Sequence, residues 1–343
     1  MAKSPPIAPG HDPGHGLHPP VGWSWESYVL AFVEEYGGWV ALTDELLRRA
    51  RGAELPTDPQ VVEKGLRRLA QRGQKTGGQY GGWMIRFLGL PTSLLRWAQW
   101  MGQFHSRFAD LPTSLRLAQL GLWDRPPVSE SKAAAWVHVG LASALLRRAQ
   151  QAEAERRLAL AEAGAKGAGV ACQVEVALLQ AKLQTDRGER AEAERNFERV
   201  AGWLGDGELS TEDRRCYEAR LVGQRAYHLT KPLPGDEEDL QGALRLFVSL
   251  VDEPFLPFVA FRKCNGLAYC HWKLGDVATG IRYARLAEQH AGDGGQVRFR
   301  IMALNLLARM VPPEEAPPIQ TRAQGLAQMI EDEDLLRRLK KGW

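Results

Sequence analysis

Small residues recur at regular intervals between residues 130 and 311, and this spacing constrains the fold more than any other feature of the chain. Gly140, Ala181, Gly223 and Ala268 follow one another at intervals of somewhat more than 40 residues. Each lies in a stretch whose larger apolar residues recur every three or four positions, which is the period of an α-helix. Since small side chains let two helices approach closely, the recurrence predicts a series of antiparallel helical hairpins.

The spacing within each unit resembles that of tetratricopeptide repeats. The resemblance spans about residues 130–311 and assigns packing roles to Trp136, Gly140, Ala152, Ala159, Ala181, Ala193, Phe197, Gly223, Ala243, Phe247, Ala268 and Ala287. The units exceed the usual length of about 34 residues, as do repeats in the sensor regions of some bacterial regulators, and the third unit has an insertion around Pro232–Asp236. The resemblance implies an α-solenoid over residues 129–311 whose surface binds a protein or peptide.

Residues 23–89 predict a small helical domain in front of this array. Apolar residues at helical spacing predict three helices, the third with the sequence PQVVEKGLRRLAQRG. The stretch QKTGGQYGGWMIRFLG after it has glycines suited to a tight turn and then a short apolar run, which predicts a hairpin. Three helices followed by a hairpin resemble the winged helix-turn-helix domain of bacterial regulators.

Basic residues are concentrated in this third helix and hairpin. Residues 61–86 hold six basic residues against one acid, whereas residues 23–58 hold three against seven. By analogy with winged-helix proteins, the resemblance implies that duplex DNA would be contacted by Lys64, Arg67, Arg68, Arg72 and Lys75. Winged helices also serve as protein-binding modules, and arginines on a helix commonly form a solvated face, so both alternatives stay open.

The phrase LPTSL occurs twice, beginning at Leu90 and at Leu111. Proline with Thr and Ser directly before an apolar run is typical of a helix start. The first predicted helix carries an aromatic stripe that includes Trp97 and Trp100, and aromatic side chains bury large areas. Residues 90–128 are therefore predicted to be connecting helices that dock the N-terminal domain onto the array.

The chain lacks the motifs of an enzyme or a cofactor-binding protein. His105, Ser106 and Asp110 are close in sequence, but adjacent helical residues do not face each other, so no catalytic triad is expected. The four cysteines lack the CxxC spacing of a zinc site. Gln74 stands where a phosphate-binding loop needs glycine before its Lys-Thr pair. We predict no enzymatic activity, no cofactor and no metal.

The two ends of the chain differ from the rest in composition. Residues 1–22 are rich in Pro, Gly and His and predict a disordered tail. Residues 312–343 predict a Pro-rich linker and one helix from about 320 to 341. No apolar run reaches the roughly 18 residues needed to span a bilayer, so we expect no membrane partner and a cytoplasmic location.

The sequence thus predicts a mainly α fold, with a helical, winged-helix-like N-terminal domain followed by an α-solenoid. Two functions fit this architecture. The first is a non-enzymatic scaffold or adaptor that binds a protein or peptide through the array. The alternative is a transcription regulator with a DNA-binding winged helix and a sensor region.

Overall fold

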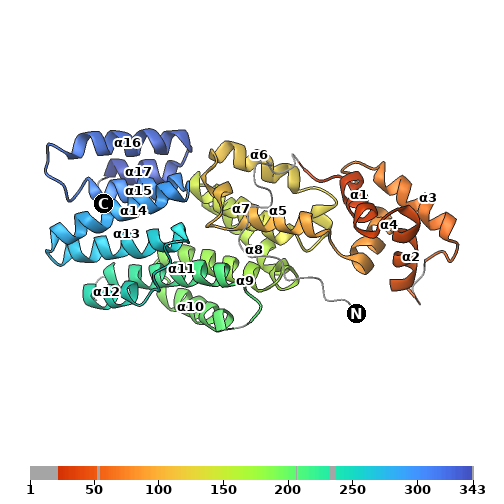
Figure 1. The fold of residues 1–343 in the computed structure, drawn as a ribbon, viewed down its shortest axis with the longest axis horizontal. Helices are drawn as coiled ribbons and strands as arrows, with labels where there is room; N and C mark the ends of the chain where they lie inside the picture. The colour runs from red at the N-terminus through yellow and green to blue at the C-terminus, as the bar shows by residue number, and fades with distance from the viewer. Residues whose placement is uncertain (1–21, 52–54, 206, 232–236, 342–343) are drawn as a thin grey trace.

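The chain is described by a computed structural model over residues 22–51, 55–205, 207–231 and 237–341. These residues form an elongated molecule built of seventeen α-helices, and they contain no β-strand (Figure 1). The prediction of a mainly α fold is confirmed. None of the helices in the described ranges is long and apolar enough to cross a membrane. The predicted N-terminal tail, except for Gly22, and the insertion around Pro232–Asp236 lie outside the described residues.

The N-terminal helices form one end of the molecule (Figure 1). They are α1 (Trp25–Tyr36), α2 (Trp39–Arg49), α3 (Pro59–Ala70) and α4 (Gly78–Trp83), followed by a π-helical turn at Met84–Leu88. Local chemistry sets two of these helix starts. The Ser24 hydroxyl accepts a hydrogen bond from the Ser27 N–H, and Asp58 caps α3 with Pro59 in its first turn.

The hairpin predicted after α3 is wrong, because residues 78–88 are helical. The glycines of this stretch allow close packing instead of a turn. A Cβ added to Gly77 would lie 2.2 Å from the Trp25 ring, and one added to Gly81 would lie 2.7 Å from it. Trp25 is fully buried, and its indole N–H donates a hydrogen bond to the Lys75 carbonyl over 2.8 Å. The glycines thus let α4 lie directly on Trp25.

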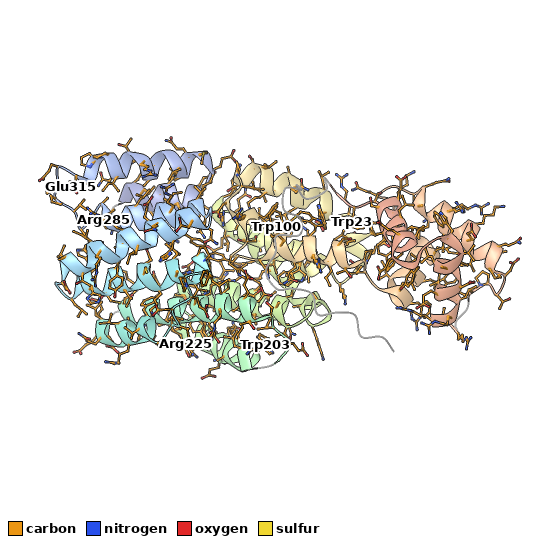
Figure 2. The ribbon with its side chains drawn as sticks, in the orientation of Figure 1. Trp23, Trp100, Trp203, Arg225, Arg285 and Glu315 are labelled. Carbon is orange, nitrogen blue, oxygen red and sulfur yellow. The ribbon has the colours of Figure 1, made fainter. Side chains whose placement is uncertain are left out.

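The two LPTSL phrases both precede helices, as predicted. These helices are α5 (Thr92–Gly102) and α6 (Thr113–Trp123). They join the N-terminal end to the array: the Trp23 and Trp123 rings meet edge to face at 6.5 Å, at the junction marked by Trp23 in Figure 2. A single apolar core continues from Trp23 through α5 to α9, so the N-terminal helices are fixed to the array by buried contacts.

The array consists of consecutive helices, each in contact with the next. They are α7 (Ala134–Arg147), α8 (Gln151–Ala168), α9 (Val170–Asp186), α10 (Arg190–Gly205), α11 (Thr211–Thr230), α12 (Leu240–Val248), α13 (Pro257–Lys273), α14 (Val277–Asp293) and α15 (Val297–Leu307). The side chains of Ser210, Asp239 and Asp276 cap the helices that follow them.

The C-terminal part differs from the prediction of a linker and one helix. It forms two helices, α16 (Ala316–Met329) and α17 (Glu333–Lys341). Pro317 and Pro318 belong to the first turn of α16, where a missing N–H costs no hydrogen bond. The break between the helices contains Glu331, whose φ of 53° is left-handed and cannot continue a helix.

Most of the residues that the repeat spacing predicts to pack between helices are buried in the structure. The buried ones are Trp136, Gly140, Ala181, Ala193, Phe197, Ala243, Phe247, Ala268 and Ala287. Gly223 is half-buried on α11, and a Cβ there would lie 3.3 Å from the Arg262 guanidinium.

Ala152 and Ala159 are exposed, so their predicted packing role is wrong. The buried small residues of α8 are Ala154 and Ala161, two positions further along. The shift arises because α7 continues seven residues beyond Gly140, whereas α9 continues only five beyond Ala181.

Because Ala193 is buried and Ala159 is exposed, the same alanine-to-leucine substitution should destabilise the fold at the first position and have little effect at the second. Ala193→Leu should lower the free energy of unfolding by about 1–3 kcal/mol, because three extra carbon atoms must enter a filled space. Ala159→Leu should change it by less than about 0.5 kcal/mol, because the side chain points to solvent. Urea denaturation of both variants measures this difference, and equal midpoints would contradict it.

Candidate functional site on the inner face of the array

The odd-numbered helices from α7 to α17 form the inner layer of the array. Neighbouring members of this layer contact one another from α7 to α15, and apolar side chains of α15 and α17 share a core. The last member, α17, returns to contact α7. The inner helices therefore complete a closed circuit of contacts.

The segment Gln103–Asp110, between α5 and α6, lies against this inner layer. Phe104 is surrounded by cationic and aromatic groups from three helices. The Arg220 guanidinium lies 4.5 Å from the centre of its ring, that of Arg262 lies 5.6 Å away, and that of Arg298 lies 5.7 Å away. The ring of Phe299 lies 5.6 Å away. Burial lowers the pKa of Arg262 to about 9, with help from repulsion by the other two arginines.

His105 enters the same layer between two carboxylates. Its Nε2 lies 3.4 Å from the Asp213 carboxylate, and its Nδ1 lies 4.0 Å from Glu175. Glu175 is buried and forms an ion pair with Arg220 over 2.5 Å. Burial alone would raise the pKa of Asp213, but hydrogen bonds from His105 and others outweigh it and lower that pKa. These contacts hold the segment to α9 and α11.

The structure does not bring His105, Ser106 and Asp110 together. The Ser106 hydroxyl donates to the Gln103 carbonyl over 2.9 Å, and Asp110 accepts a hydrogen bond from the Arg298 backbone N–H over 2.9 Å. The three side chains thus serve separate structural contacts. Among the described residues, no three His, Cys, Asp or Glu side chains gather as they would around a metal ion.

A buried cluster of three arginines and two aspartates joins the first and last inner helices. The Asp332 carboxylate, fully buried, lies 3.0 Å from Arg298 Nε and 3.7 Å from Arg147 Nε. Arg116, 1 % exposed, also approaches Asp110 and Asp332, and its Nε and Nη1 have no hydrogen-bond partner. Arg147 Nη1 donates to the Ala109 carbonyl. Three cations against two acids leave the cluster with an excess of positive charge.

The pKa values reflect this imbalance. Burial, with repulsion from Arg116 and Arg298, holds the pKa of Arg147 well below its ordinary value. Burial alone would raise the pKa of Asp332, but Arg298 and Arg147 outweigh it and lower that pKa. Burial raises the pKa of Asp110 more than the nearby arginines lower it. The carboxylate of Asp332 is therefore the main stabilising anion of the cluster.

A second set of contacts closes the array at its edge. The Thr113 N–H donates to the Ile330 carbonyl over 3.1 Å, and the Ser114 N–H donates to Glu331 over 2.9 Å. Arg148 also donates to the Glu331 carboxylate over 3.1 Å. The second LPTSL phrase thus binds the turn between α16 and α17.

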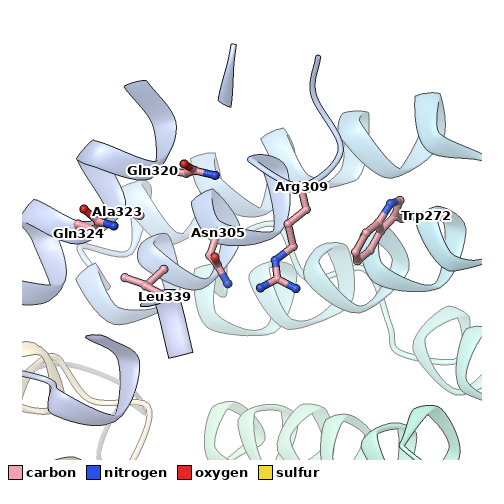
Figure 3. A pocket seen from close by; sticks show the side chains of 7 residues that line it. All are labelled: Trp272, Asn305, Arg309, Gln320, Ala323, Gln324 and Leu339. Atoms are coloured by element: carbon pink, nitrogen blue, oxygen red, sulfur yellow. The ribbon is translucent and has the colours of Figure 1, made fainter. Parts of the chain in front are cut away.

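Two clefts formed by described residues lie along the inner helices, and the first of them is also lined by α16. The first has a volume of about 370 Å³ and is lined by Trp272, Asn305, Arg309, Gln320, Ala323, Gln324 and Leu339 (Figure 3). Figure 3 shows Asn305 and Arg309 side by side, between Leu339 and Trp272. The second has a volume of about 330 Å³ and lies between α7, α9, α15 and α17, with Phe104 in its wall. The first is mainly neutral and amide-rich, whereas the second is basic.

The five residues predicted to contact DNA lie on and after α3, at the opposite end of the molecule from α17 (Figure 1). Lys64, Arg67, Arg68, Arg72 and Lys75 are all exposed. Arg67 is engaged locally: it pairs with Glu63 over 2.8 Å, and its guanidinium lies 4.3 Å from the centre of the Trp39 ring. Arg72 donates to the Thr76 carbonyl over 2.6 Å. Lys64 and Arg68, four residues apart on the helix, remain on one open face.

Sequence reasoning missed the residues of both clefts and of the buried cluster. Arg147, Arg298 and Asp332 come from helices far apart in the chain, so no spacing connects them. One local signal was available: Glu175 stands alone in the apolar stretch VACQVEVALL, and a charge in such a run requires a buried partner.

No protein-family model, curated protein or solved structure matches this chain. The geometry of its own residues therefore carries the functional argument.

The buried cluster predicts that neutralising Asp332 lowers the free energy of unfolding strongly, whereas neutralising Asp334 lowers it only slightly. Asp332→Asn should lower the free energy of unfolding at pH 7 by about 3–5 kcal/mol, because Arg147 and Arg298 lose their shared anion. Asp334→Asn should cost less than about 1 kcal/mol, because its partners Arg337 and Arg338 are partly exposed.

The destabilisation caused by Asp332→Asn should depend on pH. Because the pKa of Asp332 is lower in the folded chain, its stabilising effect is present above about pH 4 and declines as the pH falls through the folded-state pKa. The stability difference between the wild type and Asp332→Asn should therefore narrow in acid. Guanidinium denaturation of both proteins at several pH values measures this stability difference. A difference that stays constant with pH would contradict the role of the ionised Asp332 carboxylate.

Proposed function

We propose that this chain is a non-enzymatic scaffold or adaptor that binds a peptide segment of a partner protein through a tetratricopeptide-like α-solenoid. The observation that carries the proposal is the amide-rich cleft in Figure 3, which is lined by residues of α16 and of the inner helices α13, α15 and α17. Consecutive helical hairpins create extended concave surfaces, and these suit elongated ligands.

The chemistry of the cleft matches that of an extended peptide. Asn305, Gln320 and Gln324 each offer an amide donor and an amide acceptor, and a peptide backbone presents both kinds of group. Trp272 adds an aromatic surface for an apolar side chain. Among the described residues that line the cleft there is no acid and no nucleophile beside a base, which favours binding over catalysis.

Selection from a phage-displayed peptide library on the full chain tests this function. Peptides that bind the wild type should bind Asn305→Ala about tenfold more weakly, because a half-buried amide loses its hydrogen bonds, and Gln324→Ala more weakly by a smaller factor, because Gln324 is exposed. Gln241→Ala, an exposed position on the outer helix α12, is the matched control and should bind as the wild type does. Equal affinity for all three variants would place peptide binding elsewhere and contradict the proposal.

A second candidate function is DNA binding by the N-terminal helices, in a transcription regulator whose array acts as a sensor. The observation that favours it is the open face that carries Lys64 and Arg68. The absence of a strand from the described part of residues 55–89 argues against a wing, so this face would act through α3 alone. Exposed basic residues at helical spacing can contact backbone phosphates.

A salt titration with mixed duplex DNA tests this alternative. If the face binds DNA, the slope of log affinity against log salt should fall in magnitude by about two in the Lys64→Gln/Arg68→Gln double variant, since two phosphate contacts are lost. The control is Arg156→Gln/Arg195→Gln, which removes two exposed arginines from outer helices. Wild-type binding no stronger than background at low salt would remove DNA from consideration.

A further inference from the structure

The second cleft gathers cationic side chains from four helices. Arg147 comes from α7, Lys182 from α9, Arg298 from α15, and Arg337 and Arg338 from α17. These positions are spread over almost 200 residues of sequence, so the fold itself brings the charges together. Arg147 is 3 % exposed, and its Nε has no hydrogen-bond partner.

The acids at this cleft do not balance these five cations. Asp186 pairs with Lys182 over 2.5 Å, and Asp334 is shared by Arg337 and Arg338. Behind the wall, Asp332 is shared by Arg147 and Arg298, which brings the acids to three. Adding the neighbouring pair Arg116 and Asp110 leaves the excess at two positive charges. Unbalanced charge in a partly buried site is costly, and a bound anion would offset it.

The rest of the cleft is apolar. Phe104, Leu146, Leu179 and Leu183 line it beside the cationic groups. A volume of about 330 Å³ is at the lower end of the range typical of small-molecule sites. An occupant therefore needs an anionic end and a compact apolar or ring-shaped body.

We propose that this cleft binds a small phosphorylated organic molecule, with its phosphate among Arg147, Arg298 and Arg337 and its body against Phe104 and the leucines. Guanidinium groups match phosphate because they present paired N–H donors with a fixed geometry. A phosphate monoester also carries up to two negative charges, which equals the excess of positive charge at the cleft. This site is separate from the amide-rich cleft and does not depend on peptide binding there.

A ³¹P NMR titration of the full chain at constant ionic strength tests the proposal. The probes are phenyl phosphate and inorganic phosphate, with phenol as an uncharged control followed by proton NMR. Phenyl phosphate should bind more tightly than inorganic phosphate, because its ring contacts the apolar wall, and phenol should not bind. Equal affinities for the two phosphates would overturn the role of the apolar wall, and no binding of either would overturn the site.

Variants at the rim of the cleft locate the binding without disturbing the core. Arg337→Gln should weaken phenyl phosphate binding about tenfold, because it removes a charged hydrogen-bond donor to the phosphate, and Lys182→Gln should weaken it by a smaller factor, because it removes a further cation of the rim. Arg195→Gln is the matched control: like Arg337, it is an exposed arginine paired with an acid three residues earlier. It should bind as the wild type does. Loss of affinity in Arg195→Gln equal to that in the rim variants would show non-specific attraction and overturn the proposal.

Discussion

The shared ion pairs of Asp332 with Arg147 and Arg298 connect the two ends of the helical array. In a solenoid each repeat contacts only its neighbours, so its two ends do not normally meet. Here the turn before α17 places a fully buried carboxylate between an arginine of the first inner helix and one near the start of α15. Removing this anion would leave two buried cations together, so the position of α17 is strongly specified.

Because α17 contacts α7, the face formed by the inner helices is enclosed instead of open. Phe104 and His105 contact α9, α11, α13 and α15, although they belong to a short connection between α5 and α6. This segment fills the part of the inner layer near the N-terminal ends of α11, α13 and α15. The clefts that remain lie beside it or toward the other ends of the inner helices. The connecting helices thus decide which part of the inner surface is available to a ligand.

The features predicted correctly from the sequence are those set by local chemistry. Helix starts at the two LPTSL phrases and the buried small residues at Ala181, Ala193 and Ala268 follow from spacing along a single helix or hairpin. The same phrase has two different environments, however: Thr92 is exposed, whereas Thr113 is buried against Ile330. The second environment depends on a residue more than 200 positions away, and nothing in the phrase itself specifies it.

The errors have similar physical origins. The glycine-rich stretch around Gly77 and Gly81 predicts a tight turn, but these glycines are four apart and lie against Trp25, which the sequence separates from them by some 50 residues. Ala152 and Ala159 fit the repeat spacing, yet a slightly longer α7 moves the contact to Ala154 and Ala161. In both cases the residue type was informative, because small residues do mark close approach. What the sequence left open was the partner, which only the packed fold identifies.

The two clefts share the helix α17, so their ligands would contact different side chains of one element. Leu339 of α17 lines the amide-rich cleft, while Arg337 and Arg338 line the basic one. α17 is a short helix, held by the buried carboxylate of Asp332 and by leucines packed against α15 and α16. If a ligand in one cleft shifted α17, it would change the free energy of binding in the other cleft, and linkage would require the effect to be equal in both directions.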